Sequence, residues 1–170
     1  VAAAALDPES AAYSFFLGVL HIQLEDGAEL ALPAFERAAE LAPDAIWPRL
    51  AIAMTLCFDT PEDPRAIELL DALDSEDLSP MQRVWWTRAR VAALIGRDHV
   101  DEAVALSYEL CDLPQAGSGD RNQAWQLMVA HGRIDDAVRL YDLAVEGGLR
   151  SSNDFAWQLA TTELEMDEGG

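Results

Sequence analysis

The chain has 170 residues, 51% of them hydrophobic, and its 31 acidic against 11 basic residues give a formal net charge of −20. This apolar content excludes an intrinsically disordered chain, and no apolar run reaches the roughly 20 residues of a membrane-spanning helix. The negative charge argues against nucleic acid and anionic lipid surfaces as partners, because both repel a protein of the same sign. We therefore expect a soluble protein with a packed core.

The first predicted element is a pair of helices over residues 11–43. Apolar residues recur at helical spacing through its first helix, which predicts an amphipathic face. That stripe consists of Tyr13, Phe16, Leu17, Leu20 and Leu24. After a turn signal at residues 25–27, Ala31, Phe35 and Ala38 follow the spacing i, i+4, i+7 and predict the second helix of the pair.

Three further pairs with the same organisation follow, over residues 45–78, 80–113 and 120–148. In each of them an alanine takes the place of Ala31, namely Ala66, Ala103 and Ala137. The intervals of 35, 37 and 34 residues are close to the period of about 34 that is typical of two-helix repeats. A small residue at this position lets the partner helix approach closely.

A final helix is predicted over residues 151–166, after a run of Ser, Asn and Asp that supplies helix N-caps. Its apolar face would close the exposed end of the last pair. No segment alternates with period two, so no sheet is expected. The predicted fold class is all-α: a single domain over residues 1–170, built as an α-solenoid of about four antiparallel helix pairs plus a C-terminal closing helix.

Several of these segments resemble the tetratricopeptide repeat family. Leu17-Gly18 followed by His21 is similar to the family's first-helix pattern, with His21 in place of the usual aromatic residue. Residues 35–43 look like the second-helix signature, and residues 132–144 fit the second half of a repeat. The resemblance covers most of the chain and is weaker in the second and third pairs. It implies right-handed stacking of helix pairs and a concave face that binds peptides or partner subunits.

No arrangement of side chains typical of catalysis or metal binding is found. His21, His99 and His131 each lie apart from any second histidine, cysteine or carboxylate at ligand spacing. Cys57 and Cys111 fall in apolar helical stretches of different pairs, which predicts buried free thiols rather than a disulfide. No nucleotide-binding or nucleophile motif occurs. We expect neither an enzyme nor a bound metal or cofactor.

A basic cluster stands out in the third pair, where four of the 11 arginines lie around Trp85 and Trp86. Arg83, Trp86 and Arg90 are spaced i, i+3, i+7 and share one helix face, which we place on the inner side of the array. Because arginine suits carboxylates and tryptophan adds stacking area, this face is a candidate anchor for an acidic or C-terminal segment of a partner. The alternative is that the arginines pair with carboxylates inside the fold. A slip of one residue in this repeat would turn Trp85 inward instead of Trp86.

A second candidate surface is apolar. Phe15, Val19 and Ile22 project from the first helix onto the predicted concave face, and Ile52 joins them from the second pair. Such residues have no intrachain partner unless another helix covers them, which favours helix-in-groove or extended-peptide recognition. The alternative is that residues 1–7 cover Phe15 and Val19.

These features predict a non-catalytic interaction module, or scaffold, that binds a partner protein or peptide on its concave face. One alternative is an export chaperone resembling the small acidic tetratricopeptide chaperones of type III secretion, because length and acidity fit that class. Another is an accessory domain of a larger enzyme or regulator, with the chemistry encoded outside these residues.

The compartment and the oligomeric state are open at this point. A cytoplasmic location is favoured over a periplasmic or otherwise exported one. The small residues 2–5, all alanine, fit either the end of a removed targeting peptide or an arbitrary boundary. The complete absence of lysine fits either GC-rich coding or a salt-adapted organism.

Overall fold

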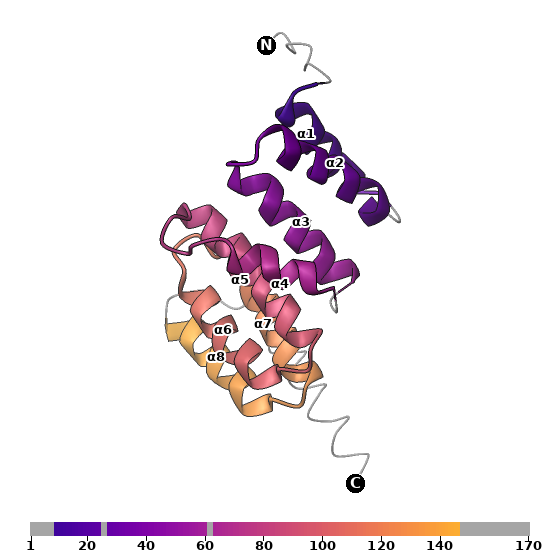
Figure 1. Cartoon of the computed structure of the whole chain (residues 1–170). Helices are drawn as coiled ribbons and strands as arrows, with labels where there is room; N and C mark the ends of the chain where they lie inside the picture. The colour runs from indigo at the N-terminus through magenta and orange to yellow at the C-terminus, as the bar shows by residue number, and fades with distance from the viewer. Residues whose placement is uncertain (1–8, 25–26, 61–62, 147–170) are drawn as a thin grey trace. The chain divides into compact units, whose positions relative to one another are not determined.

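A computed structural model describes residues 9–24, 27–60 and 63–146 (Figure 1). These residues form eight α-helices and no strand, which confirms the predicted all-α class. The predicted closing helix over residues 151–166 lies outside the described residues. None of the described helices is long and apolar enough to cross a bilayer.

The chain divides into two compact units, Val1–Asp120 and Arg121–Gly170. That residues 1–170 form a single domain stays a prediction. The helices of the first unit are α1 (Ala11–His21), α2 (Gly27–Leu41), α3 (Ile46–Asp59), α4 (Pro64–Asp71), α5 (Pro80–Ile95) and α6 (Val100–Asp112). The remaining helices are α7 (Ser118–Ala130), whose first residues belong to the first unit, and α8 (Ile134–Glu146). Each predicted pair thus contains two helices, although α4 is short.

Local sequence signals explain where several helices begin. The Ser10 hydroxyl accepts a hydrogen bond from the Tyr13 amide at 3.1 Å and caps α1. Asp63 caps α4 in the same way, with Pro64 in the first helical position, where its missing amide hydrogen costs nothing. At α5, Ser79 and Gln82 form a reciprocal capping box that satisfies two backbone amides.

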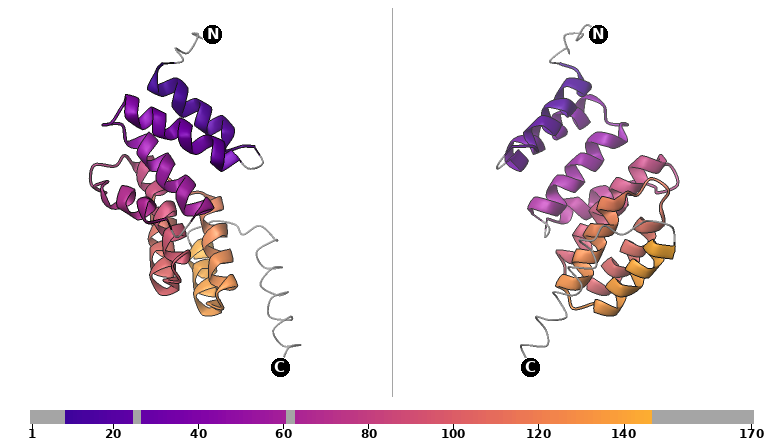
Figure 2. Two further views of the ribbon diagram at one scale, coloured as in Figure 1. Left: turned by 45° about the vertical axis from the view of Figure 1, so that its right-hand side comes forward. Right: turned by 180° about the vertical axis from the view of Figure 1, so that it is seen from behind.

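In the first unit, helices pack mainly against their neighbours in the sequence, and α3 also packs against α5. Helix α2 contacts both α1 and α3, helix α3 contacts α4 and α5, and α5 contacts α6 (Figure 2). Short connections between packed neighbours make α2 antiparallel to both α1 and α3, so α1 and α3 run in the same direction.

The predicted alanine register is confirmed by burial. The four alanines that define it, Ala31, Ala66, Ala103 and Ala137, are each completely inaccessible to solvent. Phe35, Leu70 and Leu110, which follow these alanines on the same stripes, are also buried. Small side chains at fixed positions therefore set how closely the helices approach, as the repeat pattern indicates.

The contact between α1 and α2 depends on Gly18. Gly18 and Ser14 are the buried residues of α1, and the ring of Phe35 from α2 lies directly on Gly18. A Cβ atom built on Gly18 would approach the Phe35 Cε1 and Cδ1 atoms to 2.5 and 2.6 Å, so the Phe35 ring would have to shift to admit any side chain at this position. The Leu17-Gly18 dipeptide thus marks the side of α1 that faces its partner helix.

This contact leaves most of the predicted apolar stripe of α1 in solvent. Phe16 and Leu20, on the side of α1 turned away from α2, are 53% and 67% exposed, and Leu24, in the turn that follows α1, is 57% exposed. Their spacing predicted an amphipathic helix correctly, but not which side of it is covered. We call these three residues the outer face of α1.

The α5–α6 and α7–α8 connections use the same backbone turn. Asp98 and Gly132 both have left-handed φ angles, 61° and 68°. In each case the amide of that residue and the amide of the next bond back to the end of the preceding helix, as in a Schellman motif. Asp98 and Gly132 are separated by 34 residues, the same interval that separates Ala103 from Ala137.

Candidate functional site

An apolar groove of about 560 Å³ lies between α1 and α3 in the first unit. Phe35 and Ala28 of α2 and Trp85 of α5 complete its lining. Helix α3 packs directly on α5, whereas this groove separates α3 from α1. The remaining lining residues are Phe15, Val19, Ile22, Gln23, Trp47, Leu50, Ala51, Met54, Thr55, Phe58 and Asp59.

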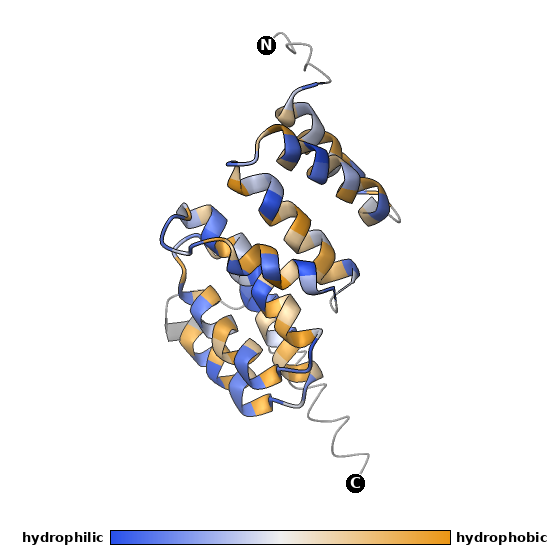
Figure 3. Ribbon diagram, viewed as in Figure 1, coloured by the Kyte–Doolittle hydropathy of each residue, from blue (hydrophilic) through white to orange (hydrophobic). Residues whose placement is uncertain are grey.

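Helical periodicity on α3 builds one wall of the groove. Trp47, Ala51, Met54 and Phe58 follow the spacing i, i+4, i+7, i+11, so they lie in one row along the helix. Figure 3 shows α3 as a largely apolar ribbon. The row extends over about 16 Å, since each helical residue rises about 1.5 Å.

A matching row on α1 builds the opposite wall. Phe15, Val19 and Ile22 follow the same i, i+4, i+7 spacing and all three line the groove. The Phe15 ring packs against the Phe35 ring, with centroids 5.6 Å apart and ring planes inclined by 49°. Such tilted aromatic contacts are favourable, so the Phe15 ring is packed against α2 where it lines the groove.

The groove is open to solvent rather than enclosed. Val19, Ile22 and Trp47 are 37%, 40% and 38% exposed, and Phe58 is 63% exposed. Large apolar side chains that line a concavity and still face water mark a surface that a further apolar element can cover.

Polar chemistry in the groove is sparse. The Thr55 hydroxyl donates a hydrogen bond to the Ala51 carbonyl oxygen at 2.9 Å, so it is already satisfied. Asp59 is the one charged residue among those that line the groove. Within residues 9–24, 27–60 and 63–146, no group of three or more His, Cys, Asp or Glu side chains is placed to hold a metal ion. The lining of the groove is therefore mostly apolar.

The structure brings together three of the four predicted apolar site residues. Phe15, Val19 and Ile22 line the groove, as expected for one face of α1. Ile52 does not: it is 7% exposed and belongs to the hydrophobic core. The reason is helical geometry, because Ile52 lies about 100° around α3 from Ala51, which does line the groove.

Arg83, Trp86 and Arg90 lie away from the groove and make contacts within the chain. An Nη atom of Arg83 donates to the Ser75 carbonyl at 2.7 Å, and the Trp86 Nε1 donates to the Leu70 carbonyl at 2.9 Å. These bonds join α5 to α4 and the segment that follows it.

Arg90 is also engaged inside the fold. Its Nη1 atom lies 2.7 Å from an Asp71 carboxylate oxygen, and its guanidinium lies 4.8 Å from the centroid of the Trp86 ring. These contacts favour the structural alternative, in which the arginines of this cluster pair inside the fold. Trp86 does not line the groove with the α1 residues; Trp85, one residue earlier, does.

Sequence reasoning missed a buried ion pair beside the groove. Arg88 forms a two-point hydrogen bond with Asp120, which is 1% exposed, and the Gly117 amide donates to the same carboxylate at 2.7 Å. The Arg88 guanidinium also lies 4.7 Å from the centroid of the Trp85 ring. The pair ties Asp120, the last residue of the first unit, to α5 beside Trp85. The position of Asp120 in the first turn of α7 was the available sequence signal.

Cys57 and Cys111 are both buried, and neither forms a disulfide, as predicted. Burial raises the pKa of the Cys57 thiol to about 11, and the charge of Arg97 lowers it by a smaller amount. At neutral pH this side chain is an uncharged thiol that packs as a small hydrophobe.

Comparison of the chain with protein-family models, with curated proteins and with solved structures gives no match.

Proposed function

We propose that this protein is a non-catalytic interaction module that binds an apolar segment of a partner protein in the groove between α1 and α3. One observation carries the proposal: two facing rows of large apolar side chains line an open concavity while remaining partly in water. Covering them removes apolar surface from solvent, which is the main driving force of protein association.

A protein segment fits this groove better than a small molecule does. Its volume is within the range of about 300–1,000 Å³ typical of small-molecule pockets. However, such pockets enclose their ligand and offer several polar groups that fix its orientation. Here Val19, Trp47 and Phe58 protrude into solvent, and the Thr55 hydroxyl is already bonded to the chain.

The test compares two neighbouring residues of α1. Val19→Glu introduces a charge into the groove, whereas Leu20→Glu introduces the same charge on the outer face of α1, where Leu20 is 67% exposed. Both variants should fold, because both side chains already contact water, and circular dichroism checks this.

We expect proteins captured from the native host to be retained by the wild-type chain and by Leu20→Glu, and to be lost from Val19→Glu. Phe58→Asp, at the opposite wall, should cause the same loss. If the same partners bind all variants equally, or if only Leu20→Glu loses them, the groove is not the binding site.

A further inference from the structure

We propose that the segment bound in the groove is a cationic amphipathic helix, with an apolar stripe facing α1 and α3 and arginine or lysine side chains near the Asp59 end. This inference rests on the proposed function and adds the conformation and the charge of the bound segment. It replaces the acidic partner expected from the arginine cluster, because Arg83, Arg88 and Arg90 of that cluster are engaged inside the fold.

The backbone of the bound segment decides its conformation. An extended peptide must find hydrogen-bond partners for its backbone amides and carbonyls when it is buried, whereas a helix satisfies most of its own. The groove lining offers few polar groups for this: the side chains of Gln23 and Asp59, the occupied hydroxyl of Thr55, and the indole N–H groups of two tryptophans. A helix with apolar residues at i, i+4, i+7 and i+11 matches the row on α3 without unsatisfied backbone groups.

One end of the groove is negative. Asp59 lines that end, is exposed, and makes no ion pair with any side chain in the described part of the chain. It also lies in the last turn of α3, which holds no basic residue, so the partial negative charge of the helix terminus is not offset. Because α1 and α3 run in the same direction, the C-terminal end of α1 lies at this end as well.

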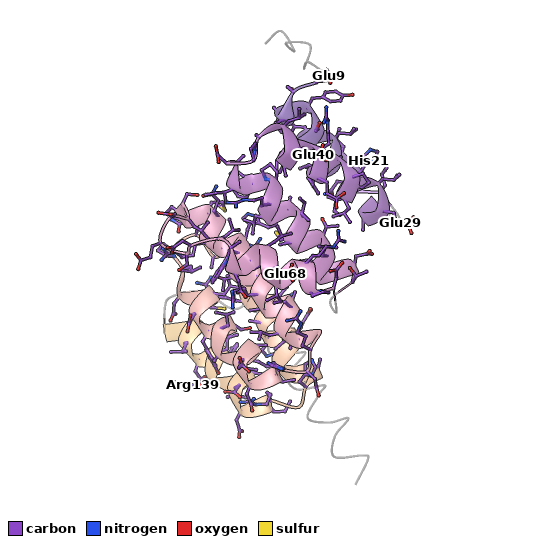
Figure 4. All side chains as sticks on the ribbon, viewed as in Figure 1. Glu9, His21, Glu29, Glu40, Glu68 and Arg139 are labelled. Carbon is purple, nitrogen blue, oxygen red and sulfur yellow. The ribbon has the colours of Figure 1, made fainter. Side chains whose placement is uncertain are left out.

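The negative charge of the rest of the first unit also favours a basic segment. Residues 1–120 contain 22 acidic residues against seven arginines. Figure 4 shows Glu9, Glu29, Glu40 and Glu68 projecting from different parts of this unit. Of the seven arginines, Arg37, Arg65, Arg88 and Arg90 already form ion pairs with carboxylates of the chain. An acidic helix is therefore repelled on approach, whereas a basic one is attracted and oriented.

The experiment uses two synthetic helices of about 16 residues, long enough to cover the α3 row. Both carry the same leucine stripe at i, i+4, i+7 and i+11, and they differ only in lysine or glutamate on the polar face. Binding to the intact chain is measured by calorimetry at about 0.05 M and about 0.5 M salt, where charges are weakly and strongly screened.

We expect the lysine helix to bind at least about tenfold more tightly than the glutamate helix at low salt, with the difference shrinking at high salt. Asp59→Asn should reduce this preference about threefold, whereas Glu68→Gln, an exposed carboxylate that does not line the groove, should leave it unchanged.

Val19→Glu distinguishes binding in the groove from general attraction of a basic peptide to an acidic protein. This variant makes the chain more negative and should nevertheless weaken binding of the lysine helix. Leu20→Glu adds the same charge elsewhere and should preserve binding. Equal binding of both helices to wild type overturns the charge inference but leaves the groove proposal standing. Binding of neither helix overturns the helical, cationic occupant proposed here, whereas the capture experiment with the groove variants tests the proposed function separately. Undiminished binding of the lysine helix to Val19→Glu and Phe58→Asp shows that it binds outside the groove and also overturns the inference.

Discussion

At the scale of single residues, Gly18 decides how closely α1 and α2 can pack. Replacement by alanine improves helix propensity by up to about 1 kcal/mol, but the added methyl group meets the buried ring of Phe35. Overpacking of this kind costs about 1–3 kcal/mol. We therefore expect Gly18→Ala to lower the free energy of unfolding by about 1 kcal/mol, measured by urea denaturation followed by circular dichroism.

Gly119→Ala is the matched control, because no atom lies within 4 Å of a Cβ built on Gly119. It should leave stability unchanged or raise it by up to about 1 kcal/mol. In a Phe35→Leu background the cost of Gly18→Ala should shrink, since the clashing ring is absent. A Gly18→Ala variant that is more stable than the wild type would contradict the close contact between α1 and α2.

Cys57 should be unreactive in the folded protein. With a pKa of about 11, its thiolate fraction at pH 8 is on the order of one in a thousand. We expect alkylation of Cys57 by iodoacetamide to be at least about 100-fold slower in the native state than in the urea-unfolded state. Peptide mapping by mass spectrometry distinguishes this residue from Cys111.

The raised pKa of Cys57 also determines how this residue's contribution to stability depends on pH. The pKa of the folded state lies above the reference value of 9.0, so burial of the neutral thiol stabilises the fold below pH 9. This contribution is lost progressively as the pH rises towards 11. Native alkylation of Cys57 should accelerate about tenfold per pH unit over that interval. Rapid alkylation of Cys57 in the native protein at pH 8 would contradict this, because it would mean that the surroundings of Cys57 open to solvent.

At the scale of secondary-structure elements, the turns at Asp98 and Gly132 offer a paired test. The left-handed conformation costs a side-chain-bearing residue about 1 kcal/mol, and glycine adopts it freely. Asp98→Gly should therefore raise the free energy of unfolding by up to about 1 kcal/mol, and Gly132→Ala should lower it by about the same amount, in urea denaturation.

Gly132→Asn is the control for the second turn, because asparagine tolerates left-handed angles better than alanine does. It should lose less stability than Gly132→Ala. If Asp98→Gly is clearly destabilising, the Asp98 carboxylate itself supports the turn.

The helices could be predicted from the sequence because their signals are local. Alanine spacing located the second helix of every pair, and capping residues such as Ser79 and Asp63 fix where helices begin. The orientation of α1 could not be predicted from periodicity, because this helix is apolar on two sides. Gly18 held the missing information: a glycine within a helix marks the side where another helix approaches most closely.

Site residues could be predicted from the sequence where the geometry of a single helix places them. They could not be predicted where the packing of several helices decides which side chain lines the groove. Phe15, Val19 and Ile22 follow from the geometry of α1 alone. The choice between Trp85 and Trp86 depends on how α5 is rotated against α4, where Trp86 bonds to Leu70. That rotation is set by contacts between residues distant in sequence, which a periodic pattern does not contain.

At the scale of the whole molecule, charge and exposed apolar surface oppose each other. The formal charge of −20 makes copies of the chain repel one another near neutral pH, although the outer face of α1 is apolar and exposed. The isoelectric point is about 4.2, so acidification removes this repulsion. We expect a solubility minimum near pH 4, measured by light scattering across a pH series.

Leu20→Glu should reduce scattering near this minimum, because it removes the most exposed apolar side chain of the outer face. Ala12→Glu, which adds the same group to an exposed position of α1 and keeps Leu20, is the control and should have a smaller effect. Equal effects of the two variants would indicate that charge alone governs association.

The repeated turn has a consequence for how this gene can change length. Asp98 and Gly132 hold equivalent backbone positions 34 residues apart, and each is bonded to the preceding helix through the same two amides. Unequal recombination between the two turns would insert or excise one unit of 34 residues, α6 with α7, and every junction that remains would keep a turn of the same conformation. The chain can therefore gain or lose whole pairs at this point without a new connection having to evolve.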